Sequence, residues 1–325
     1  MAEVIPIGPR TEPGRCRALT IKGARCRNRA GESGYCKVHL AEGPGRPAPK
    51  DGLGRALEFV RRRLTGDYEI DEFGFDRQLT EEVFNTLARF LHETWWRVDW
   101  IGMENVPSEG GALLVSNHAG TLPWDAVVMK FGVLDKHPAH RHVRLLAADL
   151  AFRTPFIGPL ARKSGNTLAS AEDAFRLLER GDLLGVFPEG FKGVGKAFKD
   201  RYKLQRFGRG GFIEIALRSR APIVPVSIVG SEEIYPMLYN AKTLARLFGF
   251  PYFPITATFP WLGPLGVIPL PSKWIIEFGE PITTDDQPED AWQDPLTVFD
   301  MNDRVREVIQ QTLYRNLMTR RSVWY

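Results

Sequence analysis

The strongest constraint on the fold is an alternation of short apolar runs with segments of helical periodicity. The apolar runs cover residues 112–116, 143–147, 183–187, 223–228 and 274–278. Apolar positions recur at helical spacing in residues 79–96, 171–178, 211–217 and 298–318. Buried strands that alternate with helices indicate a sheet with parallel strands. The sequence therefore predicts an α/β fold with a mixed, largely parallel sheet flanked by helices.

A polar block containing His118 and Asp125 follows the first of these runs, where its strand should end. In open α/β sheets, ligands bind outside the carboxyl ends of the strands. A carboxylate seven residues after the histidine can accept one ring N–H and leave the other ring nitrogen free to take a proton. We predict a general base oriented by an aspartate. A structural histidine beside a helix-capping aspartate is the alternative.

A second block, Phe187-Pro188-Glu189-Gly190, follows the run at residues 183–187. If the strands are parallel, its carboxylate lies at the same sheet edge as the histidine. The glycine permits close backbone approach to a ligand. A basic, glycine-rich stretch comes next, which suits a ligand that carries phosphate. Its cations are Lys192, Lys196, Lys199, Arg201, Lys203, Arg206 and Arg209.

Residues 190–196 also come close to a nucleotide-binding P-loop, because they read G-x4-G-K after a strand. The hydroxyl that should ligate magnesium is missing, since residue 197 is alanine. We therefore do not expect a P-loop nucleotidase.

Together with the proline-bracketed apolar run at residues 221–230, the two blocks resemble, in order and spacing, the glycerolipid acyltransferase family. The resemblance extends over roughly residues 97–282. It implies an O-acyltransferase that uses acyl-CoA or acyl-carrier protein, needs no cofactor for catalysis and acts on a lipid acceptor. It implies His118 as the base and Asp125 as the residue that holds it. The substrate-binding residues would be Asn117, Gly120, Arg162, Phe187, Pro188, Glu189, Gly190, Lys192 and Lys196.

Two departures from the family pattern bear on the acceptor. Six residues rather than four separate the histidine from the aspartate, which resembles the mono- and diacylglycerol acyltransferase-like branch. The family's phosphate-binding block should fall near residues 165–170, which contain no arginine, although Arg162 and Lys163 lie just before them. Both a neutral glycerolipid and a lysophospholipid such as 1-acylglycerol-3-phosphate remain open as acceptors.

All three cysteines of the chain lie near its amino terminus, in the array Cys16, Cys26, Cys36 and His39. Four sulfur and nitrogen ligands are the number that a closed tetrahedral zinc site needs. The spacing resembles the CCCH zinc modules of the plant WRC type, which bind DNA. We predict a structural zinc ion here. A basic tail with incidental thiols is the alternative.

Composition shifts divide the chain into four predicted parts. These are a zinc module at 1–40, a glycine- and proline-rich linker at 41–54, an amphipathic helical segment at 55–96 and an acyltransferase-like α/β domain at 97–325. Residues 1–50 hold 10 Lys and Arg against 4 Asp and Glu, so the +4 charge of the chain belongs to its amino-terminal part. The basic helix at 55–64 suits an anionic membrane surface or an ordinary solvated face.

Residues 247–272 carry no charge and contain six prolines, which exclude a regular membrane-spanning helix. A buried loop and an element that touches lipid both remain open. The amino terminus has no apolar core of signal-peptide length. We expect a cytoplasmic protein at the inner face of the membrane.

Two other functions compete with acyl transfer. The chain could be a catalytically silent protein that binds lipid or nucleic acid through its basic amino-terminal module. It could also be a hydrolase that uses the same histidine and aspartate with water as the acceptor.

Overall fold

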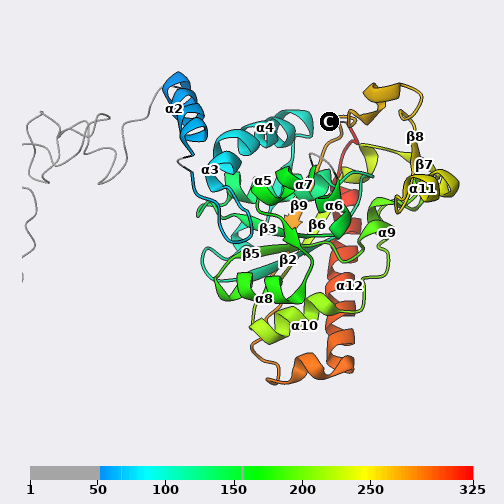
Figure 1. The fold of residues 1–325 in the computed structure, drawn as a ribbon. Helices are drawn as coiled ribbons and strands as arrows, with labels where there is room; N and C mark the ends of the chain where they lie inside the picture. Colours follow the sequence, from blue (N-terminus) through cyan, green and yellow to red (C-terminus); the bar gives the residue numbers. More distant parts are fainter. Residues whose placement is uncertain (1–51, 67, 155–156, 325) are drawn as a thin grey trace, which may run out of the picture. The chain divides into compact units, whose positions relative to one another are not determined.

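A computed structural model describes residues 52–66, 68–154 and 157–324. The chain forms two compact units, one up to Tyr68 and one from Glu69 onward. The described part of the first unit is α2 (Gly52–Thr65), which confirms the predicted helix at 55–64 (Figure 1). The four proposed zinc ligands and the predicted linker up to residue 51 lie outside the described residues, so the zinc site stays a prediction.

The second unit is built on a seven-stranded sheet in the order β1-β9-β6-β2-β5-β3-β4 (Figure 1). The strands are β1 (Asp99–Ile101), β2 (Ala112–Ser116), β3 (Val143–Ala147), β4 (Thr167–Leu168), β5 (Leu183–Val186), β6 (Ile223–Val229) and β9 (Ile275–Phe278). The five strands from β6 to β4 run parallel, whereas β9 is antiparallel to β6 and parallel to β1. The predicted mixed, largely parallel sheet is confirmed.

Alternation along the central strand β2 sends side chains into two cores, because successive strand residues face opposite sides. Leu113 and Val115 pack in one core with α8 (Ala171–Glu179), α10 (Gly211–Ser219) and α12 (Pro295–Thr319). Ala112 and Leu114 pack in the other core with α5 (Trp124–Lys136). Helices therefore cover both faces of the sheet, as the apolar strands require.

The helical segment predicted at 79–96 runs from Arg77 to Trp95 and changes winding along its length. Its parts are α3 (Arg77–Leu79), the wider π-helical turn η1 (Thr80–Phe84), α4 (Asn85–Arg89) and a second π-helical turn, η2 (Phe90–Trp95). Ala88 of this helix packs against Phe131 and Leu134 of α5. The segment thus belongs to the compact unit that begins at Glu69 and lies ahead of the predicted boundary at residue 97.

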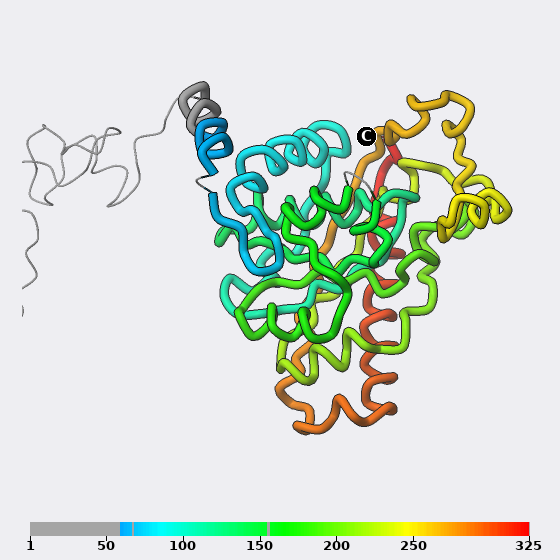
Figure 2. Tube along the Cα trace, viewed as in Figure 1, coloured from blue at the N-terminus to red at the C-terminus, as the bar shows by residue number. Residues whose placement is uncertain are grey.

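The connection between β6 and β9 is long and has structure of its own. It contains β7 (Met237–Asn240), α11 (Lys242–Phe248) and β8 (Pro254–Thr256), with β7 and β8 paired antiparallel. Figure 2 shows this connection in yellow and gold at one side of the sheet. Among the described residues, no helix combines the length and apolar character that crossing a bilayer requires.

Candidate active site

The loop after β2 begins with a side chain that ties two strands together. The Asn117 side chain donates from Nδ2 to the carbonyl of Ile228 at 3.0 Å and accepts its N–H at 2.8 Å. Asn117 is buried, so both groups of the amide are satisfied away from water. The bond pair fixes the end of β2 against β6, and the chain leaves the carboxyl edge of the sheet from a fixed point.

The structure brings His118 and Asp125 together at this edge. Nδ1 of His118 lies 2.8 Å from Oδ2 of Asp125. The same carboxylate accepts the N–H of Ala119 at 2.7 Å and the N–H of Ala126 at 2.8 Å. The Asp125 side chain is fully buried and the His118 side chain is 14% exposed. With Nδ1 engaged, Nε2 is the ring nitrogen left for a substrate.

The Glu189 carboxylate fixes the histidine from its backbone side. Its Oε1 accepts the N–H of His118 at 2.9 Å, and its Oε2 accepts the N–H of Gln205 at 2.6 Å. The side chain is fully buried. The ring of Phe187, from the same block, lies 4.6 Å from the His118 ring between centroids. The end of β5 therefore holds the histidine through a carboxylate and an aromatic ring.

The short helix α9 (Phe191–Val194) packs directly on the loop that carries His118, residues 117–123. A Cβ atom on Gly193 would lie 2.5 Å from the backbone oxygen of His118 and 2.9 Å from Cβ of Glu189. Real Cβ atoms do not approach other heavy atoms so closely, so only glycine permits this packing.

Behind Glu189 lies a buried charged network that the sequence did not predict. Nζ of Lys196 lies 3.0 Å from Oε1 of Glu232 and 3.7 Å from Oε2 of Glu189. Burial raises the pKa of Glu232 to about 7, although the Lys196 ammonium acts in the opposite direction. Glu232 comes one turn after β6, so its position at a strand end was the signal that could have found it.

A second part of this network reaches the carboxyl-terminal end of the chain. The Tyr202 hydroxyl donates to Oε1 of Glu233 at 2.5 Å and accepts the N–H of Gly230 at 3.0 Å. Arg320 donates to the same Glu233 oxygen at 3.0 Å. Burial is the main reason that the pKa of Tyr202 stands well above its usual value. The region behind the active site is thus tied to the residue that follows α12.

Tyr252, from the uncharged segment, also contacts the loop that carries His118. Its hydroxyl donates to the backbone oxygen of Thr121. Burial, with the nearby negative charge of Asp125, raises the pKa of Tyr252 to about 12. Sequence reasoning missed this residue because nothing in its local pattern distinguishes it from other aromatic residues of the segment.

The remaining predicted residues fall into two groups. Gly120 (φ 91°) and Gly190 (φ 53°) have left-handed backbone, and Pro188 accepts the N–H of Gly208 at 3.3 Å. Arg162 and Lys192 are exposed. Neither cation pairs with the histidine block among the described residues, so the structure does not bring these two to the center.

The turn at residues 164–166 is held by cations that point inward. Nζ of the buried Lys130 donates to Oδ1 of Asn166 at 2.9 Å and to the backbone oxygen of Ser164. Burial holds the pKa of Lys130 well below its usual value. Arg144 donates to the backbone oxygen of Gly165 at 2.9 Å. Exposed Arg162 instead stacks over the Phe152 ring, 4.8 Å from its centroid.

The cations of the basic stretch after Gly190 are exposed, apart from the paired Lys196. Part of it borders an open cavity of about 710 Å³ beside the end of the chain. The cationic side chains that line this cavity are Arg201, Lys203 and Arg321, together with Arg320, which is paired with Glu233 of the same lining. Such a lining suits a ligand with negative charge.

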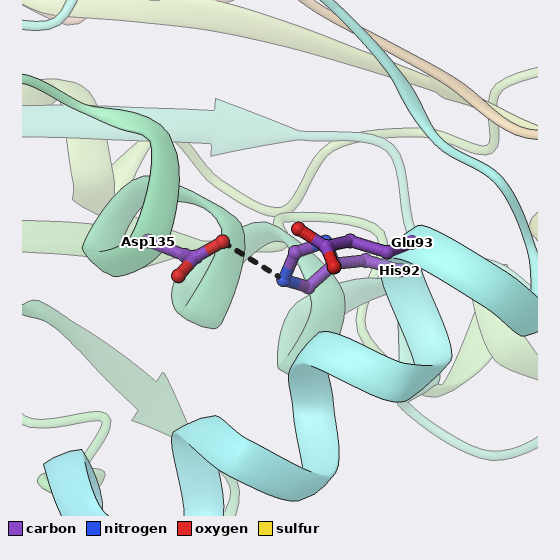
Figure 3. Close-up of side chains that lie close together, drawn as sticks. All are labelled: His92, Glu93 and Asp135. Atoms are coloured by element: carbon purple, nitrogen blue, oxygen red, sulfur yellow. Dashed lines mark ion pairs between the residues drawn. The ribbon is translucent and has the colours of Figure 1, made fainter.

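A cluster of groups able to ligate metals lies elsewhere, where His92, Glu93 and Asp135 come within 4.8 Å of one another (Figure 3). Nζ of Lys136 lies 2.5 Å from Oε1 of Glu93 and 3.1 Å from Oδ2 of Asp135. Arg89 pairs with the other oxygen of Asp135. Because two cations already neutralise the carboxylates, we interpret the cluster as an ion-pair network that fastens α4 and η2 to α5.

Comparison with protein families gives two matches. The model of the Acyltransferase family matches residues 97–229, which contain His118, Asp125 and Glu189. The model of a domain of unknown function, DUF5763, matches residues 14–50, where the cysteine array lies.

Two groups of relatives resemble the chain. An uncharacterised protein of Mycobacterium tuberculosis is 58% identical over 267 residues, which cover 82% of this chain and 75% of the relative. A chicken (Gallus gallus) protein named DGAT1/2-independent enzyme synthesizing storage lipids is 27% identical over 192 residues, 59% of this chain and 54% of the relative.

Among solved structures, the crystal structure of the 1-acyl-sn-glycerophosphate (LPA) acyltransferase PlsC from Thermotoga maritima is similar in fold, with a TM-score of 0.52. The match covers 82% of this chain and 90% of that one at 18% sequence identity.

Proposed function

Because the chain belongs to the glycerolipid acyltransferase family, we propose that it moves a fatty acyl group from an acyl thioester to a hydroxyl group of a glycerolipid or lysophospholipid. The observation that carries the proposal is the 2.8 Å contact between Nδ1 of His118 and Oδ2 of Asp125 at the carboxyl edge of the sheet. This contact supports His118 as the general base and Asp125 as its positioning residue.

The chemistry begins with proton transfer. A carboxylate only accepts hydrogen bonds, so Nδ1 carries the proton and Nε2 carries the lone pair. Nε2 takes the proton of the acceptor hydroxyl as its oxygen attacks the thioester carbonyl carbon. Glu189, which accepts the N–H of His118, fixes the backbone while this happens.

The acyl group is then released onto the acceptor. The tetrahedral intermediate places negative charge on the former carbonyl oxygen, and the N–H of Gly120, beside the histidine, is a candidate donor to it. As the carbon–sulfur bond breaks, the leaving thiolate takes the proton from the imidazolium. The products are an ester and a free thiol, and His118 is neutral again.

Two features bear on the substrates. Residues 165–170 contain no arginine, and the nearby Lys130 and Arg144 are hydrogen-bonded to the turn of residues 164–166. This favours a neutral glycerolipid acceptor over a phosphorylated one. The exposed cations after Gly190 favour a donor with phosphate groups, such as acyl-CoA. We place this chemistry at the inner face of the membrane, where lipid acceptors reside.

The test compares the wild-type protein with His118→Ala and Asp125→Asn. Acyl-CoA is supplied with a monoacylglycerol, a diacylglycerol or 1-acylglycerol-3-phosphate, and both thiol release and lipid products are followed. We expect His118→Ala to lower turnover about 10²- to 10⁴-fold, the usual worth of a general base. The exposed His140→Asn variant serves as the matched control and should keep wild-type turnover.

Other results would overturn the proposal. Turnover by His118→Ala at the wild-type rate would show that His118 is not the general base. Equal fatty-acid release with and without acceptor would identify a hydrolase. No turnover by the wild-type protein with any acceptor would favour a catalytically silent binding protein.

A further inference from the structure

Residues 237–268, here called the arm, expose an unusual amount of apolar surface. Its six most exposed large apolar residues are between 58% and 74% exposed, namely Leu238, Tyr239, Leu247, Phe248, Trp261 and Leu265. The arm stands at one side of the sheet, away from the helical layers (Figures 1 and 2). Exposed apolar surface of this extent marks an interaction site in a folded protein.

The arm is an organised element. The β7–β8 pair forms its base, and the rings of Phe253 and Phe248 stack with centroids 5.9 Å apart. Phe253 also contacts the ring of Phe259 at 6.1 Å. Phe253 and Phe259 are half-buried in this framework, which holds the more exposed apolar side chains of the arm outward.

The charges of the arm are of one sign. Residues 234–276 contain no aspartate or glutamate. Lys242 and Arg246 lie one turn apart on α11, both are exposed, and neither forms an ion pair with any residue that the structure describes. Cations on the same helix as the exposed Leu247 and Phe248 fit an anionic lipid surface, where headgroups attract the charges and acyl chains take the apolar side chains.

The arm is hydrogen-bonded to the loop that carries His118, residues 117–123, here called the catalytic loop. The Tyr252 hydroxyl donates to the backbone oxygen of Thr121, three residues after His118. The Tyr252 ring also packs beside Gly195, at the end of α9. Near the other end of the arm, Val267 accepts a hydrogen bond from the Tyr235 hydroxyl. A surface that the arm contacts is therefore held close to the loop that carries the base.

We infer that the arm docks on an anionic lipid bilayer and holds the catalytic loop at the membrane surface, so that the acceptor reaches His118 from the lipid phase. The inference rests on the proposed function for its substrate class. It differs from that function in assigning the membrane contact to these residues.

The experiment uses the full-length protein and three variants. The first is Leu247→Ser/Trp261→Ser/Leu265→Ser, which removes exposed apolar side chains from the arm. The second is Lys242→Glu/Arg246→Glu. The control, Leu296→Ser/Phe299→Ser/Met318→Ser, removes exposed apolar side chains from α12. Binding is measured by sedimentation with vesicles of phosphatidylcholine, with or without phosphatidylglycerol.

We expect the first variant to lose at least about tenfold in affinity for vesicles with phosphatidylglycerol. The second variant should lose about tenfold or more on these vesicles at low salt and little at high salt. The α12 control should bind as the wild type does. Turnover of an acceptor embedded in vesicles should fall with binding, while turnover of a short-chain, freely soluble acceptor stays at the wild-type rate.

The inference would be overturned if both arm variants bound vesicles as the wild type does. It would also be overturned if the wild-type protein did not bind vesicles. A wild-type dimer that the first variant converts to a monomer would show that a second copy covers the arm instead. Failure of every protein to use the soluble acceptor would refute the proposed function, and the vesicle measurement would still test the docking.

Discussion

At the scale of single residues, two histidines differ in their hydrogen bonds. His118 is held by a carboxylate at 2.8 Å, whereas His92 is buried with neither ring nitrogen hydrogen-bonded among the described residues. Its Nε2 lies 3.7 Å from Oδ2 of Asp135, beyond hydrogen-bond distance. Burial lowers the pKa of His92 to about 4, because a charged imidazolium would lose its hydration there.

This pKa predicts an acid-side loss of stability. Between its normal pKa near 6.5 and about 4, the unfolded chain binds a proton at residue 92 that the folded chain does not bind. The free energy of unfolding should therefore fall as the pH falls, by about 3 kcal/mol in total from this residue. His92→Leu should flatten that decline in chemical unfolding measured from pH 7 to pH 4.5.

The control for this measurement is His140→Asn at an exposed position, which should follow the wild-type curve. A curve for His92→Leu that is parallel to the wild-type curve would assign the acid sensitivity to other groups.

Single residues also mark the limits of sequence reasoning at the site. His118 and Glu189 could be placed together because each follows an apolar strand, and parallel strands end at one edge of a sheet. Asp125 could be added because it lies seven residues after the histidine in the same block. The strand-end position does not tell what a side chain touches. Glu189 accepts the N–H of His118, and Lys196 pairs with Glu232. Both partners come from loops far away in sequence, so the strand-end position could not predict these contacts.

At the scale of elements, the catalytic loop is shaped by the fit of α9 against it. Gly193→Ala would set a Cβ atom 2.5 Å from the backbone oxygen of His118, so the loop or the helix has to move. A displacement of about 1 Å can cost roughly 10²-fold in rate. We expect a fall in kcat of that order in steady-state kinetics, with the folded state retained by circular dichroism.

Gly208→Ala is the matched control in the same region, because a Cβ atom there meets nothing within 4 Å. Equal kcat values for the two alanine variants would mean that the loop absorbs the added methyl group without moving the base.

Elements with strong periodicity were predictable and short ones were not. The strands at 112–116 and 143–147 and the helix at 171–178 agree with β2, β3 and α8 within a residue at either end. β1 and β4 were not predicted, because strands of three and two residues are too short to show an alternation of apolar and polar residues. Only the start of α5, near Asp125, was anticipated; its extent was not predicted because the helix is buried over most of its length, which leaves little amphipathic signal.

At the scale of the whole molecule, the end of the chain is joined to the region behind the active site. The side chains of Arg320 and Glu233 are 5% and 7% exposed and lie 3.0 Å apart. Arg320→Met would leave a buried carboxylate without its cation, which typically costs about 3 kcal/mol or more of unfolding free energy. Urea unfolding measures this cost.

The comparison variant is Arg315→Met, whose exposed guanidinium pairs with Glu277 and whose loss should cost under about 1 kcal/mol. The double variant Arg320→Met/Glu233→Gln should regain part of the lost stability, since the uncompensated charge is gone. Equal costs for Arg320→Met and Arg315→Met would show that the buried pair contributes no more than a surface pair.

The topology of the sheet has one more consequence for the arm. β6 and β9 are antiparallel neighbours, and such strands can be joined by a turn of two residues. The arm is thus an insertion into a hairpin, and no strand would change its neighbour if that insertion were shortened, lengthened or replaced. The surface that this connection presents can therefore change while the order of the sheet, and the strand ends that position His118 and Glu189, stay as they are.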